Sequence, residues 1–293
     1  MSLQRWPLGF ADSPSYAAPL TPWASFPPAS TVEGQIRRPE ELPHVSLIAL
    51  GGIWRPLGGR QVLKARYINP VTIQDLTANG VLVERIGPFP GGLVRAGMSL
   101  SMTLKFSHPG VGNFNRGVWL RAGAANAVLD QSRSFSSVSS AVTNTTAAGV
   151  MIGSLDVLSD ISASHRGYLN GNVGLTFSSA IHPLTVDFSQ PWDAAIYAQS
   201  GAENAITITG ASWIAGQAGY FTSAAHGYAI GDKVTVAGIT PTGYNGTFII
   251  VDVLDSTTIV VDMPVDPGAW VSGGTSARIS PVTSQSYSLE LWG

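Results

Sequence analysis

The sequence contains no cysteine among its 293 residues. Disulfide bonds, cysteine-ligated zinc, iron–sulfur clusters and thiol nucleophiles are therefore excluded. Charge is also scarce, because Asp, Glu, Lys and Arg together make up 12% of the residues, about half the usual share. This composition favours β structure over helices, whose exposed faces are normally rich in Lys and Glu. It also suits a protein that lies against other chains in a larger assembly.

Lysine is almost absent, with Lys64, Lys105 and Lys233 as the full set, and the formal net charge is −2. A basic run that could follow a phosphate backbone is missing, so nucleic acid is not an expected partner. Apolar runs stay well short of the 18 residues that a membrane-spanning helix requires. The first ten residues also lack the basic start and apolar stretch of a secretory signal. We therefore expect neither membrane insertion nor export through such a signal.

What the sequence does contain is β patterning. From Met98 to Phe106 apolar and polar residues alternate strictly, which predicts an antiparallel strand with one buried and one wet face. Further short segments of this kind recur at intervals of about ten residues, with Gly or Pro between them, which is typical of a sandwich or barrel. We predict an all-β protein built on an antiparallel, jelly-roll-like sandwich.

Residues 1–30 have a different character. Their six prolines exclude a long helix and favour an extended path. Aromatic residues are too frequent for a solvated linker and suggest a strip that lies in the groove of another chain. We predict an extended docking arm whose contacts are Trp6, Phe10, Tyr16, Trp23 and Phe26. The alternative is that this segment packs on the chain's own surface.

The rest of the chain divides into three predicted units. Residues 31–65 indicate a small β collar, with short apolar runs between Gly-Gly pairs. Residues 66–210 and 276–293 are assigned to the sandwich, whose last strand lies in 284–292. Residues 211–275 hold closely spaced strands and are predicted to be a β-module inserted into the sandwich, since insertions are tolerated at loop tips. Two consecutive domains are the simpler alternative.

Three segments together resemble fibre and appendage proteins of tailed bacteriophages. They are the Gly-x-x-Trp-Arg-Pro turn at 51–56, the final strand YSLELWG at 287–293, and HGYAIGDKVTVAGITPTGYNGTF at 226–248, which is similar to a small β-module of phage virion proteins. The resemblance implies a homotrimer that projects from the tail or capsid of the virion. Residues 1–30 match no segment of that family, so the point of attachment stays open.

Catalysis is not expected. A glycosidase needs two carboxylates across a sugar-binding cleft, and the candidate pairs are Asp187 with Asp193 and Asp252 with Asp255. Strand or turn positions account for both pairs. The sequence has no Gly-x-Ser-x-Gly elbow and no His-Glu-x-x-His, so we assign no catalytic residue and expect no cofactor. A histidine repeated around a trimer axis is an alternative route to a metal site.

Two sets of residues are candidates for contacts. Trp54 and Arg55 suit a subunit contact, because Trp and Arg often anchor interfaces; alternatively, Trp54 covers the apolar end of its own collar. Aromatic rings with polar neighbours suit glycan recognition, because sugar faces stack on rings. The predicted glycan surface of the inserted module comprises Trp213, Tyr228, Tyr244 and Trp270. The alternative is that some of these rings fill the core of a small module.

The sequence thus predicts a phage virion structural protein of the tail-fibre or spike type. It would be attached through its N-terminal arm, with other virion proteins, further copies of itself and host-surface glycan as partners. A capsid-bound head fibre or decoration protein is one alternative. A glycan-cleaving tailspike is the other.

Overall fold

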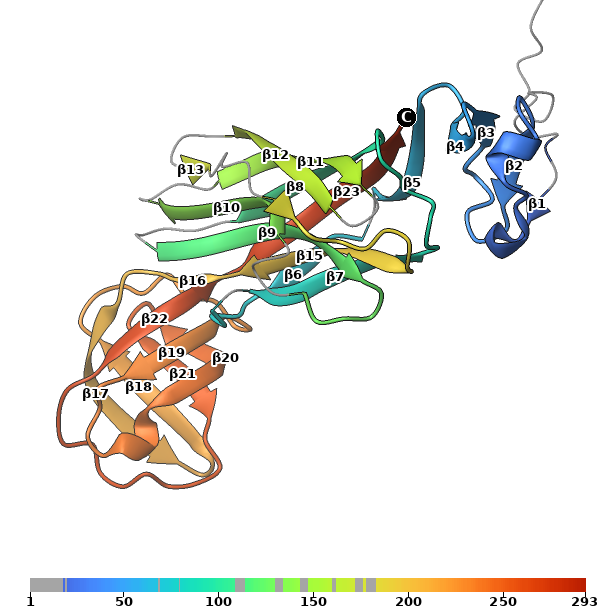
Figure 1. Cartoon of the computed structure of the whole chain (residues 1–293). Coiled ribbons are helices and arrows are strands. Elements are labelled where there is room, and N and C mark those ends of the chain that lie inside the picture. Colours follow the sequence, from blue (N-terminus) through green and yellow to red (C-terminus); the bar gives the residue numbers. More distant parts are fainter. Residues whose placement is uncertain are drawn as a thin grey trace, which may run out of the picture.

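The structure is a computed structural model. It describes residues 18, 20–67, 69–78, 80–108, 114–129, 134–142, 147–159, 162–171, 176–177 and 183–293. Within these residues the regular elements are β-strands and three short 3₁₀ turns, so the predicted all-β fold class is confirmed (Figure 1). None of the described segments forms a helix with the length and hydropathy needed to cross a bilayer.

The first unit is a four-stranded sheet in the order β1-β2-β3-β4. Its strands are β1 (Leu20–Thr21), β2 (Ile36–Pro39), β3 (Leu47–Leu50) and β4 (Ile53–Pro56), and the 3₁₀ turns η2 (Trp23–Ser25) and η3 (Ala29–Thr31) lie between β1 and β2. Gly51 and Gly52 both have positive φ, as a two-residue type I′ hairpin turn requires. The predicted boundary at residue 30 is wrong, because β1 pairs in parallel with β2 and so belongs to this sheet.

Two sheets form the sandwich. One has the order β13-β10-β9-β15-β7 and the other β14-β12-β11-β8-β23-β5, with β6 also paired to β23. The bounds are β5 (Arg60–Arg66), β6 (Val71–Ile73), β7 (Val81–Phe89), β8 (Ser99–His108), β9 (Phe114–Ala124), β10 (Ser134–Val142), β11 (Ala147–Ser159), β12 (Ser162–Gly171), β13 (Thr176–Phe177), β14 (Pro183–Leu184), β15 (Trp192–Gln199) and β23 (Val282–Trp292). The collar predicted to end at residue 65 ends earlier, because β5 pairs with β23. The jelly-roll description stays a prediction.

The alternation predicted for residues 98–106 is confirmed. Met98, Leu100, Met102, Leu104 and Phe106 are each at most 3% exposed. They join one continuous core that also takes in Leu47, Trp54 and other residues of the N-terminal sheet. The N-terminal sheet and the sandwich are therefore packed as one hydrophobic unit.

The second core belongs to a closed barrel. Six strands form the ring β22-β17-β18-β21-β20-β19, which β19 closes by pairing again with β22. They are β17 (Ile206–Ile214), β18 (Gln217–Thr222), β19 (Lys233–Ala237), β20 (Gly246–Asp255), β21 (Thr258–Asp262) and β22 (Thr275–Ser280), and the 3₁₀ turn η5 (Thr242–Tyr244) precedes β20. The barrel interior is filled by its own apolar cluster, which includes Ile208, Tyr220, Val234 and Ile259.

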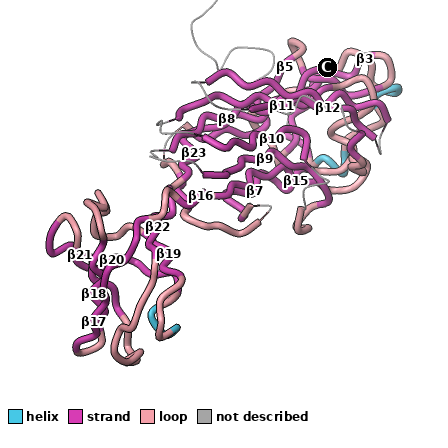
Figure 2. The backbone as a smooth tube through the Cα atoms, turned by 90° about the vertical axis from the view of Figure 1, so that its left-hand side faces the viewer, coloured by secondary structure: helices cyan, strands magenta, loops and turns pink. Residues whose placement is uncertain are grey.

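The barrel is inserted into the sandwich. The chain leaves β15, passes through β16 (Gly201–Ala202), builds the barrel and returns as β23 between β8 and β5 (Figures 1 and 2). The predicted bounds 211–275 are too narrow at both ends. Ile206 pairs with Ser276, and this pairing places all of β17 and β22 in the barrel. Residues up to 210 are assigned to the sandwich by the sequence, but from Ile206 onward the chain belongs to β17.

Leu289 offers a test of the central position of β23. Its side chain is 1% exposed, and its backbone lies between Met102 of β8 and Lys64 of β5. We expect Leu289→Ala to lower the free energy of unfolding by about 2–5 kcal/mol, because it leaves a cavity in the core. Equilibrium urea unfolding measures this loss. The control is Leu254→Ala on the barrel, where the side chain is 65% exposed and the effect should stay below about 0.5 kcal/mol. A loss below about 1 kcal/mol for Leu289→Ala would contradict the assignment.

Candidate functional site

A groove on the barrel brings together three of the four residues predicted to form a glycan surface. Trp213, Tyr244 and Trp270 line it, and Tyr228 does not. We call it the barrel groove, and its lining is Gly210, Ala211, Ser212, Trp213, Phe221, Tyr244, Asp266, Gly268, Ala269 and Trp270, around a volume of about 450 Å³. Its lining residues come from β17, β18, η5 and the connection from β21 to β22.

One wall of the groove is a strand edge. Ala215 and Gly216 have positive φ and form a two-residue turn that joins β17 to β18. Alternate residues of such a hairpin direct their backbone groups away from the partner strand, and here these are Ala211 and Trp213. On the side of β17 that faces away from β18, the described strand pairing is with β22 and involves Ile206 and Thr207. It does not reach Ala211 or Trp213. The groove is therefore bordered by backbone donors and acceptors that a ligand can use.

The two indole rings of the groove are held by hydrogen bonds. Trp213 donates its indole N–H to the carbonyl of Met263 at 2.7 Å, and Trp270 donates to the carbonyl of Gly273 at 3.3 Å. Both side chains are half-buried against the barrel core. A ring fixed before a ligand arrives loses little conformational freedom on binding, so these rings are preorganised for stacking.

Tyr244 is a buried residue of the groove lining. Its side chain is 1% exposed and its hydroxyl donates to the carbonyl of Gly268 at 2.9 Å, which holds the opposite wall. Burial raises the pKa of Tyr244, and the negative charge of Asp266 raises it further, so the hydroxyl remains a donor at neutral pH. Tyr220 in turn donates to the carbonyl of Tyr244 at 2.8 Å. Tyr244 thus positions the loop at Gly268 and is not an exposed ring, contrary to the prediction from the sequence.

Phe221, Asp266 and Ser212 complete the groove and were not predicted. Phe221 is 41% exposed and lies over Gly210, where a Cβ atom would come within 3.2 Å of its ring. Asp266 is exposed and accepts the N–H of Gly268 at 2.8 Å through one carboxylate oxygen. A sequence signal for Phe221 did exist: neighbouring residues of a strand face opposite sides, so Tyr220 and Phe221 cannot both be buried in the barrel.

Tyr228 is in the barrel core, as the alternative interpretation had it. It is 7% exposed and its hydroxyl donates to the carbonyl of Ser276 at 3.2 Å. Its ring stacks on His226, with 5.0 Å between ring centroids. His226 accepts the N–H of Tyr228 through Nδ1 at 2.9 Å, so its Nε2 carries the proton and faces the carbonyl of Asp255. Both side chains have structural roles.

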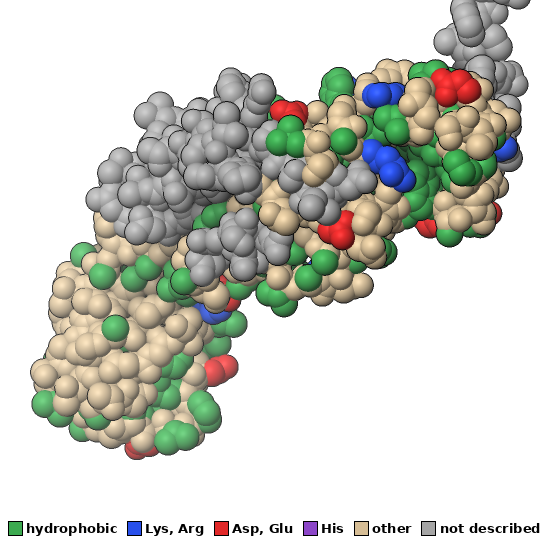
Figure 3. All heavy atoms as spheres, in the orientation of Figure 1, with side chains coloured by type: hydrophobic (Ala, Val, Ile, Leu, Met, Phe, Trp, Pro, Cys, Tyr) green, Lys and Arg blue, Asp and Glu red, His purple; other side chains and the backbone are tan. Residues whose placement is uncertain are grey.

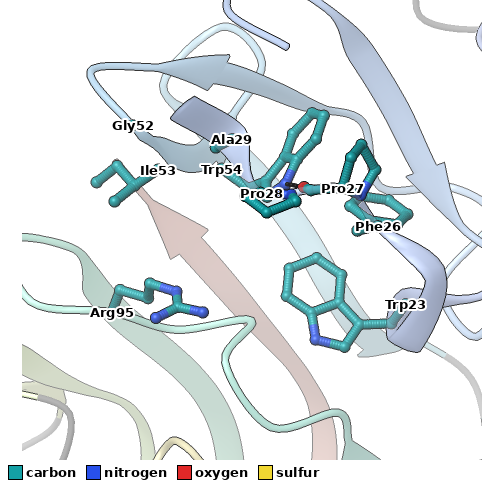
Figure 4. Close-up of a pocket in the computed structure, with 9 residues that line it drawn as sticks. All are labelled: Trp23, Phe26, Pro27, Pro28, Ala29, Gly52, Ile53, Trp54 and Arg95. Atoms are coloured by element: carbon teal, nitrogen blue, oxygen red, sulfur yellow. Dashed lines mark hydrogen bonds between the residues drawn. The ribbon is translucent and has the colours of Figure 1, made fainter. Parts of the chain in front are cut away.

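The N-terminal aromatics form a second hollow (Figure 4). Trp23 donates its indole N–H to the carbonyl of Gly91 at 2.6 Å, and Trp54 donates to that of Pro27 at 3.1 Å. Phe26 lies between the two indoles, with ring centroids 4.8 Å from Trp23 and 5.0 Å from Trp54. The bond from Trp23 joins the N-terminal sheet to the loop that follows β7. Arg95 faces Trp23 across the hollow (Figure 4).

These contacts bear on the predicted docking and subunit residues. Trp23 and Phe26 pack on their own chain, as the alternative for the arm proposed, and Trp54 is 8% exposed. Little ring surface of Trp54 is left for another subunit. Arg55 is half-buried beside it. Trp6, Phe10 and Tyr16 lie outside the described residues. Docking and subunit contact stay predictions.

The acid pairs weighed for catalysis have structural partners. Asp193 is fully buried and its carboxylate lies 2.6 Å from the guanidinium of Arg85. Asp187 accepts the N–H of Ser189, and Asp255 accepts that of Thr257, both in turns. Asp252 is exposed and accepts the N–H of the next residue. In the part of the chain that the structure describes, no three His, Asp or Glu residues are grouped to hold a metal ion.

Burial of Tyr220 gives a pH-dependent prediction. Burial raises the pKa of its hydroxyl far above the ordinary value of about 10, so the stability it contributes is complete below about pH 10 and is lost as the pH rises further. We expect Tyr220→Phe to cost about 0.5–1.5 kcal/mol at pH 7, through the lost hydrogen bond to Tyr244. The decline above pH 10 should become shallower. Urea unfolding between pH 7 and 11 measures both.

The control for this measurement is Tyr67→Phe, whose ring is 71% exposed and which should leave stability unchanged. An unaltered alkaline decline in Tyr220→Phe would contradict the prediction.

Comparisons with known proteins add little to this geometry. No protein-family model matches the chain, and no curated protein matches it. Among solved structures, the chain matches the CBM2 module of the evolved Dit of Lactobacillus casei BL23 phage J-1 at 10% sequence identity. That match covers 92% of this chain and 86% of the other, with a TM-score of 0.14. At that TM-score the likeness carries no argument about fold or function, and the barrel groove has to be interpreted from its own residues.

Proposed function

We propose that the protein is a structural component of a bacteriophage virion that binds host-surface glycan through the barrel groove. The observation that carries glycan binding is the pair of indoles, Trp213 and Trp270, each held by a hydrogen bond at the edge of an open hollow. Sugars present apolar C–H faces that stack on aromatic rings, and hydroxyls that need polar partners. Asp266, Ser212 and the edge of β17 line the same groove and supply such partners.

The surface around the groove supports contact with a ligand. Ile214, Val265 and Val271 are 72%, 74% and 66% exposed, and together with Phe221 they are large apolar side chains on or near the segments that border the groove. Apolar side chains left exposed near a hollow are typical of a binding surface. On the face shown in Figure 3 the barrel carries few charged side chains.

The virion role rests on the resemblance of three sequence segments to phage appendages. In this proposal the chain is a homotrimer of the tail-fibre or spike type, and residues 1–17 attach it to other virion proteins. Three equal grooves per trimer, repeated around a particle, would give avidity from weak single sites. A capsid-bound head fibre or decoration protein would use the same parts at another position on the particle.

The rival class is a glycan-cleaving tailspike. The observation that favours binding over cleavage is the placement of the acids. Asp187 and Asp255 are engaged in turns, Asp193 is buried and ion-paired with Arg85, and the barrel groove is lined by a single carboxylate, that of Asp266. A glycosidase of the common type requires two.

Trp270→Ala tests the groove. We expect it to weaken binding of host-surface polysaccharide roughly 3- to 10-fold, because it removes one stacking face worth about 0.5–1.5 kcal/mol. Isothermal titration of the purified protein measures this change, and the same samples are assayed for released oligosaccharide. Trp292→Ala is the matched control, since that ring is 42% exposed on the sandwich and should leave affinity unchanged.

Equal affinities for Trp270→Ala and the parent chain would exclude the groove as the glycan site. Release of oligosaccharide would favour the enzyme.

Deletion of residues 2–17 tests attachment and assembly. This deletion leaves the Trp23–Phe26–Trp54 contacts intact, so the sandwich core is preserved. We expect light scattering to give the full protein a solution mass of three times its 30.6 kDa chain, and the shortened protein three times the mass of its shortened chain. The shortened protein should be missing from purified particles. Particles that carry it in the normal amount would show that attachment lies elsewhere. A monomeric mass for the full chain would overturn the trimer.

A further inference from the structure

The charges of the barrel are unevenly distributed. Residues 206–280 contain two basic residues, Lys233 and Arg278, against five acidic ones, namely Asp232, Asp252, Asp255, Asp262 and Asp266. The barrel therefore has a formal net charge of −3, from two positive and five negative groups, whereas the whole chain has −2. The negative field of the molecule is concentrated on the barrel.

Both cations of the barrel are engaged at the end that faces the sandwich. Arg278 lies 3.0 Å from Glu203 and 3.2 Å from Asp232. Lys233 donates to the carbonyl of Gln74 at 3.2 Å. Glu203 and Gln74 both precede the barrel in the chain, so these contacts form the junction with the sandwich. No other described residue of the barrel is Lys or Arg, and the lining of the barrel groove carries only a negative charge.

The groove combines aromatic rings with that negative charge. The faces of Trp213, Trp270 and Phe221 present the negative side of their ring quadrupoles, which attracts a cation within about 6 Å. Asp266 is exposed and adds a full negative charge, and since one of its carboxylate oxygens accepts the N–H of Gly268, a ligand can use the other. Rings and carboxylate both favour a positively charged group, and both disfavour an anion.

We infer that the barrel groove selects sugars that carry an ammonium group, over their neutral N-acetylated counterparts and over sugars that carry a carboxylate. This inference rests on the proposed glycan-binding function and names its ligand class. The sugar ring stacks on an indole, while the ammonium group lies against an aromatic face and pairs with Asp266. A uronate in the same position would have its charge next to Asp266, with no cation of the barrel free to offset it.

The experiment compares three probes by isothermal titration at about pH 6, with the full-length protein. They are a tetramer of glucosamine, the corresponding tetramer of N-acetylglucosamine, and a tetramer of galacturonate. We expect the glucosamine tetramer to bind roughly 5- to 10-fold more tightly than the N-acetylated one, from cation–π attraction and one exposed ion pair. Added salt should reduce this preference, and the galacturonate tetramer should bind most weakly.

The variant Asp266→Asn tests whether the preference for the glucosamine tetramer arises at Asp266. The amide oxygen of the new side chain can still accept the N–H of Gly268, so the loop is retained, and we expect the preference for the glucosamine tetramer to fall by about 3-fold. Asp252→Asn changes the net charge of the barrel by the same amount, at an exposed position outside the groove lining, and should leave the preference unchanged.

The outcomes separate this inference from the proposed function. If the N-acetylated tetramer binds as tightly as the glucosamine tetramer or more tightly, and Trp270→Ala weakens that binding, the selection for ammonium is wrong and glycan binding stands. An equal loss of preference in Asp266→Asn and Asp252→Asn would also overturn it, because the effect would come from overall charge. If none of the probes and no host polysaccharide binds, both the inference and the proposed function fail.

Discussion

The antiparallel pairing of β17 with β22 at the base of the barrel is the contact on which the rest of the molecule depends. Ile206 opposes Ser276 and Thr207 opposes Thr275, which closes the ring of six strands. The same pairing brings the two ends of the insert side by side. The pairing of β16 with β22, with Gly201 opposite Ser280, continues this contact toward the sandwich. The chain can therefore leave β15 and return as β23 in the middle of a sandwich sheet, between β8 and β5. An insert with separated ends would pull that sheet apart.

The barrel groove is a consequence of the same pairing. Because β17 stays with β22 for two residues and then continues with β18 alone, its second half has an open edge. The connection between β21 and β22 has to cross the end of the barrel to complete the ring, and it crosses beside this edge. At the crossing Gly274 approaches so closely that a Cβ atom would lie 2.4 Å from Ile239. The opening and the rings on either side of it are thus products of barrel closure.

The two aromatic sites illustrate different uses of the same residue types. In the N-terminal hollow the indole of Trp54 bonds to the carbonyl of Pro27 within the same unit, and the indole of Trp23 bonds to the carbonyl of Gly91 and so ties this unit to the sandwich. In the barrel groove Trp213 and Trp270 bond to carbonyls of the connection between β21 and β22 and remain beside an open hollow. The difference lies in what covers the ring faces, and residue type gives no information about that.

The sequence by itself determined the all-β class, the buried face of β8 and the presence of a separate β-module, because strand periodicity and turn residues are local properties. It did not determine which aromatic rings of the module are exposed. Tyr228 and Tyr244 are buried and Phe221 is exposed, because barrel curvature and the crossing loop decide what lies above each ring. It also missed Asp266 as a groove residue, since an Asp in a Pro- and Gly-rich loop has the same local pattern wherever the loop is placed. Those assignments depend on contacts between residues far apart in the chain, and only the tertiary structure decides them.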